Sequence, residues 1–426
     1  MGRRALTPLT RRGWAVIAGS FAVATLGRTL GVVELFVLAS GGMGLVAVGV
    51  ITVIVQRTVN LEGSRRLVPP RVHAGSDSRV ELTVLNRGRR TSPVVMLRDS
   101  VVQVKAPRAG DDQVVDSSTP TRQARFHVAP LQPDETNRAA YRLGAERRGL
   151  FRVGPLEVVV ADPFGLASFT RRVAPATEFT VYPRVEPVAA PPLTTGHDPR
   201  TGAGHASLLG SGDEFYGLRA YEVGDDLRRV HWPSTARQDE LMIRQHELPW
   251  QGRATVLLDV RAAVHSEESF EEAVSAAASL VTACWRRDSQ VRLLTTDGLD
   301  SGFGGGPAHL SALMEHLAVL EPGTGRMDTL PGALRRRASG ALVLVTTAGG
   351  GTGQLEQVGL GAVGFGWAGV VLIEAGGRND GNRLQRAPVA NGAGRSRLVV
   401  HVRAGESFGP AWNAAVTKTP VAGMRR

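Results

Sequence analysis

Two apolar stretches stand close together near the start of the chain. The first covers residues 13–27, and the second covers residues 30–55 with Glu34 as its only charged residue. The second stretch exceeds the ~20 residues that a helix needs to cross a bilayer, whereas the first is marginal. No small-residue cleavage pattern with a polar segment after it follows the first stretch, so a signal peptide is disfavoured. The pattern predicts a two-helix transmembrane hairpin over residues 1–56.

Arginines flank this hairpin on both outer sides, and its short connector carries little charge. The flanking arginines are Arg3, Arg4, Arg11, Arg12, Arg57, Arg65, Arg66 and Arg71. Because cytoplasmic flanks of membrane helices are enriched in Lys and Arg, both termini and all soluble domains are expected at the cytoplasmic face of the cell membrane. Glu34 is expected near the headgroups and not at the centre of the membrane.

Residues 57–185 change to a period-two alternation of apolar and polar positions, which is typical of half-buried strands. Strands are predicted at Val80–Leu85, Val94–Leu97, Ala124–Val128, Ala139–Leu143, Phe151–Val153, Leu156–Val160 and Phe179–Tyr182. Gly, Pro and Asp separate these short runs. The spacing favours an antiparallel β-sandwich of the immunoglobulin or fibronectin type. Residues 186–210, rich in Pro and then Gly, are predicted to form a flexible linker.

Residues 253–426 alternate apolar strands with helical periodicity, and the segment Gly376–Arg397, rich in Gly, Asn and Arg, is expected to be mobile. The expected strands are Ala254–Asp259, Val291–Thr295, Ala341–Thr346, Gly369–Glu374 and Leu398–Val402, and the expected helices are Phe270–Arg287, Leu310–Leu320, Leu330–Arg337 and Pro410–Val416. This alternation predicts a doubly wound α/β domain with a mostly parallel sheet. The chain is therefore predicted to have several domains.

The segment between linker and α/β domain, residues 211–252, places aromatic side chains at intervals among opposite charges. Its candidate binding residues are Glu214, Phe215, Arg219, Tyr221, Asp225, Arg228, Trp232 and Arg237. Aromatic and arginine side chains are frequent anchors of protein interfaces. Ion-pair networks are also often purely structural, so an ordered connection before the next strand is the stronger interpretation.

This segment resembles the signature of the DUF58 family of bacterial proteins. The resemblance rests on Gly212, Glu214, Phe215, Leu218, Arg219, Tyr221, Gly224 and Asp225, and then on Arg228, Val230, Trp232, Ala236, Arg237, Leu241 and Arg244. The elements Arg147–Leu156 and Asp162–Leu166 are similar to two further family motifs, and turn chemistry accounts for both. What the resemblance implies is a partnership with a MoxR-type AAA+ ATPase, and with a transglutaminase-like membrane protein.

The last domain is similar to a von Willebrand factor A domain, as in other DUF58 proteins. A metal-binding version carries Asp-x-Ser-x-Ser after the first strand, because hydroxyl and carboxylate oxygens suit Mg²⁺. Here Asp259 is followed by Arg261 and Ala263, so both serines are missing and a guanidinium enters the site. The prediction is a degenerate site around Asp259 with no metal. Asp259 is expected to pair with Arg261 or with an arginine of the signature.

Composition narrows the function further. Lys and Arg number 50 against 39 Asp and Glu, a formal net charge of +11. No nucleic-acid-binding motif accompanies this charge, and membrane lipid explains much of it. The single cysteine, Cys284, excludes an intramolecular disulfide.

The preferred hypothesis is a membrane-tethered adaptor with no catalytic residues and no cofactor. A metal-dependent ligand-binding domain is the alternative, followed by a nucleic-acid binder and by a hydrolase using Asp225, His231 and Ser234.

Overall fold

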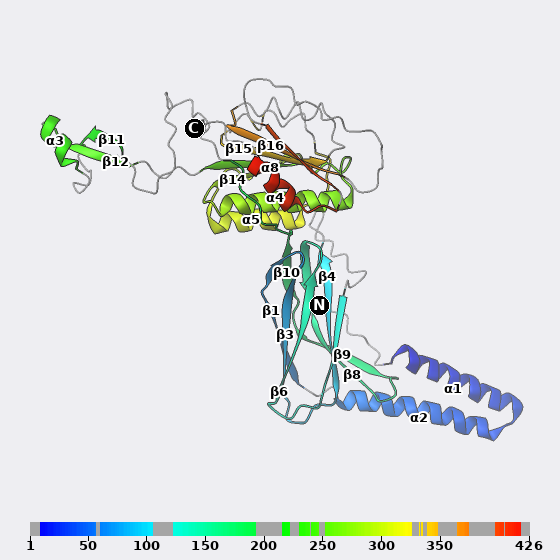
Figure 1. The fold of residues 1–426 in the computed structure, drawn as a ribbon. Helices are drawn as coiled ribbons and strands as arrows, with labels where there is room; N and C mark the ends of the chain where they lie inside the picture. Colours follow the sequence, from blue (N-terminus) through cyan, green and yellow to red (C-terminus); the bar gives the residue numbers. More distant parts are fainter. Residues whose placement is uncertain are drawn as a thin grey trace. The chain divides into compact units, whose positions relative to one another are not determined.

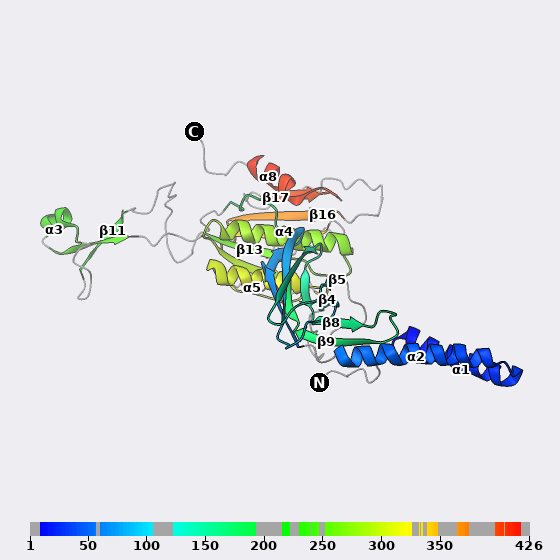
Figure 2. The same cartoon turned by 90° about the horizontal axis from the view of Figure 1, so that it is seen from below.

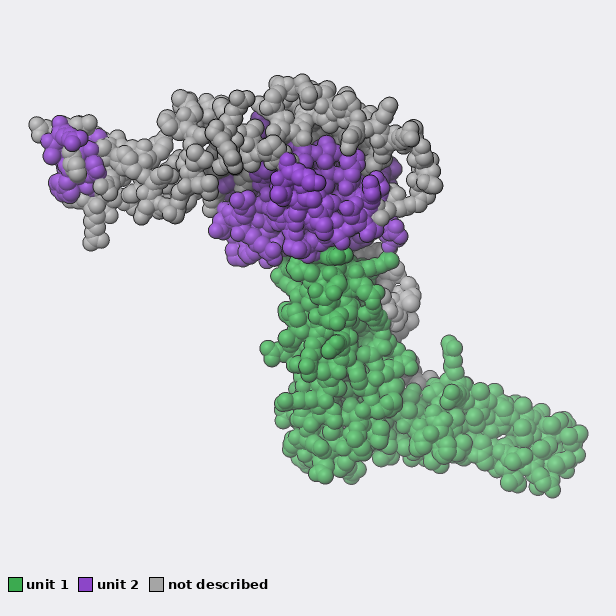
Figure 3. Space-filling model, viewed as in Figure 1, with its two compact units in different colours: residues 1–184, 315–320 green, residues 185–314, 321–426 purple. Residues whose placement is uncertain are grey.

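The computed structural model describes most of the chain as two compact units. The described residues are 9–56, 60–104, 122–192, 215–221, 230–238, 240–246, 252–325, 332, 334, 339–347, 364–374, 397–403 and 405–418. One unit contains residues 1–184 with 315–320, and the other contains residues 185–314 with 321–426 (Figure 3). Each unit is described separately below.

The first unit begins with two long antiparallel helices, α1 (Arg11–Leu30) and α2 (Val33–Gln56). Small residues spaced seven apart, Gly13, Ser20 and Gly27, are the buried positions of α1. Ser20 and Gly27 face Gly42 and Leu35 of α2, whereas Gly13 faces the backbone of Leu166. Large apolar side chains elsewhere on both helices are exposed. Both helices are long and apolar enough to cross a membrane. Glu34 is exposed in the first turn of α2, next to the connector, as predicted.

Within the described residues of the first unit, ten strands follow the helices. They are β1 (Leu61–Val68), β2 (Arg71–His73), β3 (Ser76–Asn86), β4 (Val95–Val104), β5 (Arg122–Val128), β6 (Thr136–Ala145), β7 (Gly149–Val153), β8 (Leu156–Ala161), β9 (Ser168–Ala174) and β10 (Thr177–Tyr182). One sheet has the order β1-β3-β6, and the other has the order β2-β10-β7-β4-β8-β9 with β5 also paired to β4. All pairs are antiparallel except β10 with β2. The seven predicted strands are present, and a single hydrophobic core is shared by both sheets.

Strand β1 was not predicted, because its two adjacent arginines resemble a basic flank of the membrane helices. Arg65 is in fact buried in the sandwich, with 1% of its side chain exposed, and it pairs with the fully buried Asp99 of β4. Its Nε and Nη2 donate to the two carboxylate oxygens at 3.0 and 2.5 Å. The Tyr141 hydroxyl of β6 donates to the same carboxylate at 2.8 Å. Arg65 therefore joins the two sheets and does not contribute to the juxtamembrane charge.

The backbone conformation and the surroundings of residue 154 explain why the Arg147–Leu156 element has a glycine there. Its φ of +98° is a conformation that side chains disfavour. A Cβ at this residue would also lie 2.5 Å from Nη2 of Arg65. The Nη1 of Arg65 meanwhile donates to the carbonyl oxygens of Val153 and Pro175. The element is structural, as predicted, because it encloses the buried guanidinium.

The core of the second unit is a five-stranded parallel sheet. The helices and strands of this part of the chain are β13 (Arg253–Leu258), α4 (Glu267–Trp285), β14 (Gln290–Thr295), α5 (Gly306–Val319), β15 (Ala341–Thr347), β16 (Trp367–Ile373), β17 (Arg397–Val402) and α8 (Phe408–Lys418). Residues 315–319 of α5 fall in the first unit. The strand order is β14-β13-β15-β16-β17, and every neighbouring pair is parallel. This order, with the second strand outside the first, is that of a doubly wound α/β sheet. Of the predicted helix Leu330–Arg337, only two residues, 332 and 334, are described, both as helical.

The segment that enters this unit is held by its last helix. Trp412 of α8 is fully buried, and its indole Nε1 donates to the Ala189 carbonyl at 2.8 Å. The Glu186 carboxylate accepts from the Gly409 amide at 2.7 Å, and the Glu186 amide donates to Ser279 of α4. Residues 186–190, predicted as the start of a flexible linker, are thus packed into the unit. The rest of that predicted linker, residues 193–210, lies outside the described residues.

Candidate functional site

The signature segment forms a small hairpin with a helix in its connection. Strand β11 (Phe215–Ala220) pairs antiparallel with β12 (Met242–His246), and α3 (Trp232–Gln238) lies between them in sequence. The Tyr221 amide donates to the Leu241 carbonyl, and the Thr235 hydroxyl accepts from the Met242 amide. These bonds fix the start of β12 against α3. Figure 1 shows the three elements together.

The predicted binding residues are spread over this hairpin. Trp232 begins α3 with 66% of its surface exposed, Arg237 is exposed in the last turn, and Tyr221 is half-buried directly after β11. Phe215 and Arg219 lie on β11, opposite His246 and Ile243 in the register. The remaining three, Glu214, Asp225 and Arg228, lie outside the described residues.

The histidine and serine of the hydrolase alternative do contact each other. The Nδ1 of His231 lies 2.7 Å from the Ser234 hydroxyl. The Ser234 amide also donates to the His231 carbonyl, so both residues form the first turn of α3. A three-residue separation at a helix start produces such a contact without any catalytic role. Asp225, the acid of that alternative, lies outside the described residues.

The second candidate region is the carboxyl end of the parallel sheet, where open α/β sheets bind ligands. Asp259 directly follows β13 and is fully buried. Arg261 binds both of its carboxylate oxygens, through Nε at 2.9 Å and Nη2 at 2.7 Å. The Thr346 hydroxyl from β15 donates at 2.7 Å, and the Arg261 amide donates at 3.2 Å. Arg261 is therefore the partner of Asp259, which confirms the first of the two predicted pairings.

This arrangement does not fit a bound metal ion. Burial raises the pKa of Asp259, but the hydrogen bonds and charge of Arg261 and the hydroxyl of Thr346 lower it by more, and the net direction is down. The carboxylate is thus ionised and already saturated by donors. A divalent ion needs oxygen ligands and would be repelled by the guanidinium. Among the described residues, no group of three His, Cys, Asp or Glu side chains is placed to hold a metal.

His265 lies next to this ion pair and was not singled out from the sequence. It precedes the Ser266 cap of α4, and its ring stands edge-on to Phe270 at 5.5 Å between centroids. Both ring nitrogens are buried, and neither has a hydrogen-bond partner among the described residues. Burial lowers the pKa of His265, and the nearby Asp259 only partly opposes this. The imidazole is therefore neutral at neutral pH.

The lowered pKa of His265 predicts a pH-dependent stability of the α/β unit. Below an ordinary histidine pKa of about 6.5, the unfolded chain binds a proton that the folded chain does not bind. The free energy of unfolding should therefore fall as the pH falls from 7 to 5. Hydrogen exchange of β13 and β15 amides at several pH values measures this loss. The variant His265→Phe should show a smaller loss, and an equal loss in both proteins would contradict the assignment.

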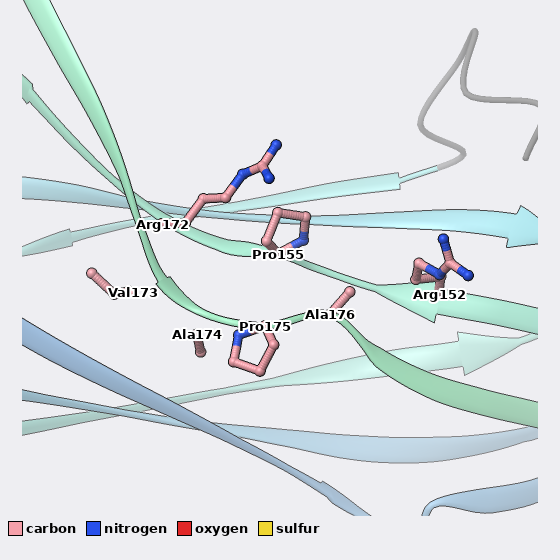
Figure 4. A pocket seen from close by; sticks show the side chains of 7 residues that line it. All are labelled: Arg152, Pro155, Arg172, Val173, Ala174, Pro175 and Ala176. Atoms are coloured by element: carbon pink, nitrogen blue, oxygen red, sulfur yellow. The ribbon is translucent and has the colours of Figure 1, made fainter. Parts of the chain in front are cut away.

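A separate pocket of about 540 Å³ lies in the sandwich, where β7 turns into β8 and β9 into β10. Arg152 and Arg172 stand on two sides of it, with Pro155 and Pro175 between them (Figure 4). Arg172 also lies 3.8 Å from Glu157. None of the predicted site residues lines this pocket. It belongs to the first unit and is independent of both candidate regions.

Comparison with known proteins matches residues 217–348 to the family described as "Protein of unknown function DUF58". The match covers the signature from Gly217 onward, the Asp259 region and strand β15. No curated protein matches the sequence.

Solved structures are similar to a limited part of the chain. A CARDB domain from Pyrococcus furiosus, in complex with di-metal ions, is 15% identical over 29% of this chain and 92% of that domain, with a TM-score of 0.20. A β-glucosidase from Listeria innocua, in complex with glucose, is 16% identical over 29% of this chain and 16% of the enzyme, with a TM-score of 0.19. Similarities of this size carry no argument about function.

Proposed function

We propose that this DUF58-type chain is a membrane-tethered adaptor, which binds another protein at the cytoplasmic face through its signature hairpin. In this proposal α1 and α2 cross the membrane and both termini face the cytoplasm. The exposed side chains of α1 and α2, such as Phe21, Leu38 and Val48, are large and apolar, as lipid contact requires. Arginines flank the outer ends of the two helices, whereas the connector between them carries little charge. This distribution supports an orientation with both termini in the cytoplasm.

Trp232 is the observation that carries the binding proposal. A tryptophan with two-thirds of its surface in water leaves a large apolar area without cover. It stands at the start of a helix whose first turn is fixed by backbone bonds to the His231 carbonyl. Ordered, exposed tryptophan is among the side chains that contribute most to protein interfaces. The candidate partner, taken from the family resemblance, is a MoxR-type AAA+ ATPase.

The ion pair at the carboxyl end of the sheet supports an adaptor over an enzyme. Asp259 is the one fully buried carboxylate at that end among the described residues, and its oxygens are occupied by Arg261 and Thr346. Such a carboxylate is not free to act as a base or to hold a metal. Its role in the proposal is structural, because it holds the loop after β13 to β15.

The test is binding of the full-length protein, reconstituted in nanodiscs, to the purified ATPase. Replacing a central interface tryptophan by alanine costs about 2 kcal/mol or more, so Trp232→Ala should weaken binding roughly 30-fold. Arg219→Ala should also weaken it. The matched control is Val94→Ala, which shortens an exposed apolar side chain of the sandwich, 58% of it in water. Absence of binding by the wild type, or an equal effect of all three changes, would reject the proposal.

A further inference from the structure

We infer that the tip of the β8–β9 hairpin, residues 162–167, is itself a membrane-contacting element that enters the headgroup layer beside α1. This inference rests on the proposed membrane insertion of α1 and α2. It assigns a lipid-contacting role to a turn that the sequence alone explains as purely structural. The exposed side chain at its tip is Phe164, with 55% of its surface in water.

The tip is attached to both membrane helices. The Thr10 amide donates to the Leu166 carbonyl at 2.9 Å, and the Thr10 hydroxyl, which caps α1, donates to the Gly165 carbonyl at 2.7 Å. On the other helix, a Cβ added to Gly49 would lie 3.2 Å from the carboxyl carbon of Asp162. Figures 1 and 2 show α2 leaving the sandwich beside β8 and β9. The tip therefore lies at the depth where α1 begins.

The lengths of the two helices leave room for the tip at this depth. The apolar part of α1, residues 13–27, spans about 22 Å at 1.5 Å per residue, which is short of a hydrocarbon core of about 30 Å. On α2, apolar side chains continue past Gly49, where Ile51, Ile54 and Val55 are about half exposed. Past the level at which α1 begins, exposed apolar side chains therefore continue on α2 alone. The tip packs into the space that a further turn of α1 would occupy.

The backbone of the tip is suited to a membrane boundary, because most of its polar groups are satisfied internally. The Asp162 carboxylate accepts from the amides of Phe164 and Ala167, and the Asp162 carbonyl accepts from the Gly165 amide. Pro163 has no amide to satisfy. Non-helical backbone is tolerated near lipid only when its polar groups are paired in this way. Phe164 then presents an exposed apolar ring at this boundary, and the exposed Trp14, a residue type that collects at membrane interfaces, lies in the first turn of α1.

Depth-dependent fluorescence quenching in proteoliposomes tests the inference on the full-length protein. An environment-sensitive thiol probe is attached at Phe164→Cys, at Val48→Cys on α2, and at Arg79→Cys, an exposed strand position of the sandwich. The native Cys284 is fully buried, and burial raises its pKa to about 12, so it should not react. Vesicles carry a nitroxide either on the headgroup or in the middle of the acyl chain.

The expected result is quenching at position 164 by the headgroup nitroxide, several-fold stronger than at position 79, with a blue shift of the emission. Position 48 should be quenched by the acyl-chain nitroxide. If position 48 is quenched but position 164 behaves like position 79, the inference is wrong and the tethering stands. If position 48 is not quenched either, the proposed tethering fails with it. Unchanged hydrogen exchange of β8 and β9 in Phe164→Cys confirms that the turn is intact.

Discussion

Asp99→Asn should lower the free energy of unfolding of the sandwich by about 3–5 kcal/mol, the cost of leaving one partner of a buried ion pair without the other. Arg65 has 1% of its side chain exposed and cannot reach water when the carboxylate is neutralised. Tyr141 loses the charged acceptor of its hydroxyl as well. Burial is the largest cause that raises the pKa of Tyr141, and it persists in the variant, so the phenol stays protonated and supplies no replacement charge. A domain with about 5–15 kcal/mol of stability would lose much of it.

Hydrogen exchange of the full-length protein in detergent measures this loss at the amides of β4 and β6. The control is Glu62→Gln, because Glu62 pairs with Arg87 at a site where more than half of each side chain is exposed. Surface pairs contribute about 0–1 kcal/mol, so this variant should differ little from the wild type. Amides of the α/β unit serve as an internal reference. A loss below about 1 kcal/mol in Asp99→Asn would show that the pair does not hold the two sheets together.

Asp259→Asn should destabilise the α/β unit by about 3 kcal/mol, at the lower end of the range for broken buried pairs. The cost is lower than for Asp99 because 11% of the Arg261 side chain is exposed, so the guanidinium can turn partly toward water. The amide of asparagine accepts with one oxygen where the carboxylate accepts with two. Protection of the β13 and β15 amides against hydrogen exchange measures the effect.

The double variant Asp259→Leu with Arg261→Met separates charge from packing. Replacing both members of a buried pair by apolar residues of similar size is often neutral, so most of the lost stability should return. Persistent destabilisation would mean that the Thr346 hydroxyl, left without its acceptor, accounts for the effect. Added Mg²⁺ should leave the melting temperature unchanged in the wild type. A rise with Mg²⁺ would instead support the metal-dependent alternative.

The sequence predicts the helices and strands of this fold better than it predicts which side chains pair with one another in space. The two apolar helices were expected at residues 13–27 and 30–55, and they are found at Arg11–Leu30 and Val33–Gln56. Alternation identified the half-buried strands, but it missed β1, β2 and β9, each of which contains arginine. The burial of an arginine can be predicted from a sequence only when the acidic residue that pairs with it is known. Asp99 lies 34 residues from Arg65, and nothing local connects the two.

The candidate site shows the same limit. The departure from a metal-binding pattern at Asp259 was visible because Arg261 is only two residues away, and the structure joins the two side chains. His265 carried no signal, since its lowered pKa depends on burial by distant parts of the chain. Whether the signature residues bind a partner stays a prediction. Three of them lie outside the described residues, and a binding role depends on a second molecule.

The contact between Trp412 and Ala189 has a consequence for the order of events on the ribosome. The two residues are 223 positions apart, so the bond between them forms only after the last helix has been synthesised. The sandwich strands are all complete by residue 182, and they can fold while the rest of the chain is still being made. We therefore expect nascent chains that stop before residue 408 to have a folded sandwich and an incompletely closed α/β unit.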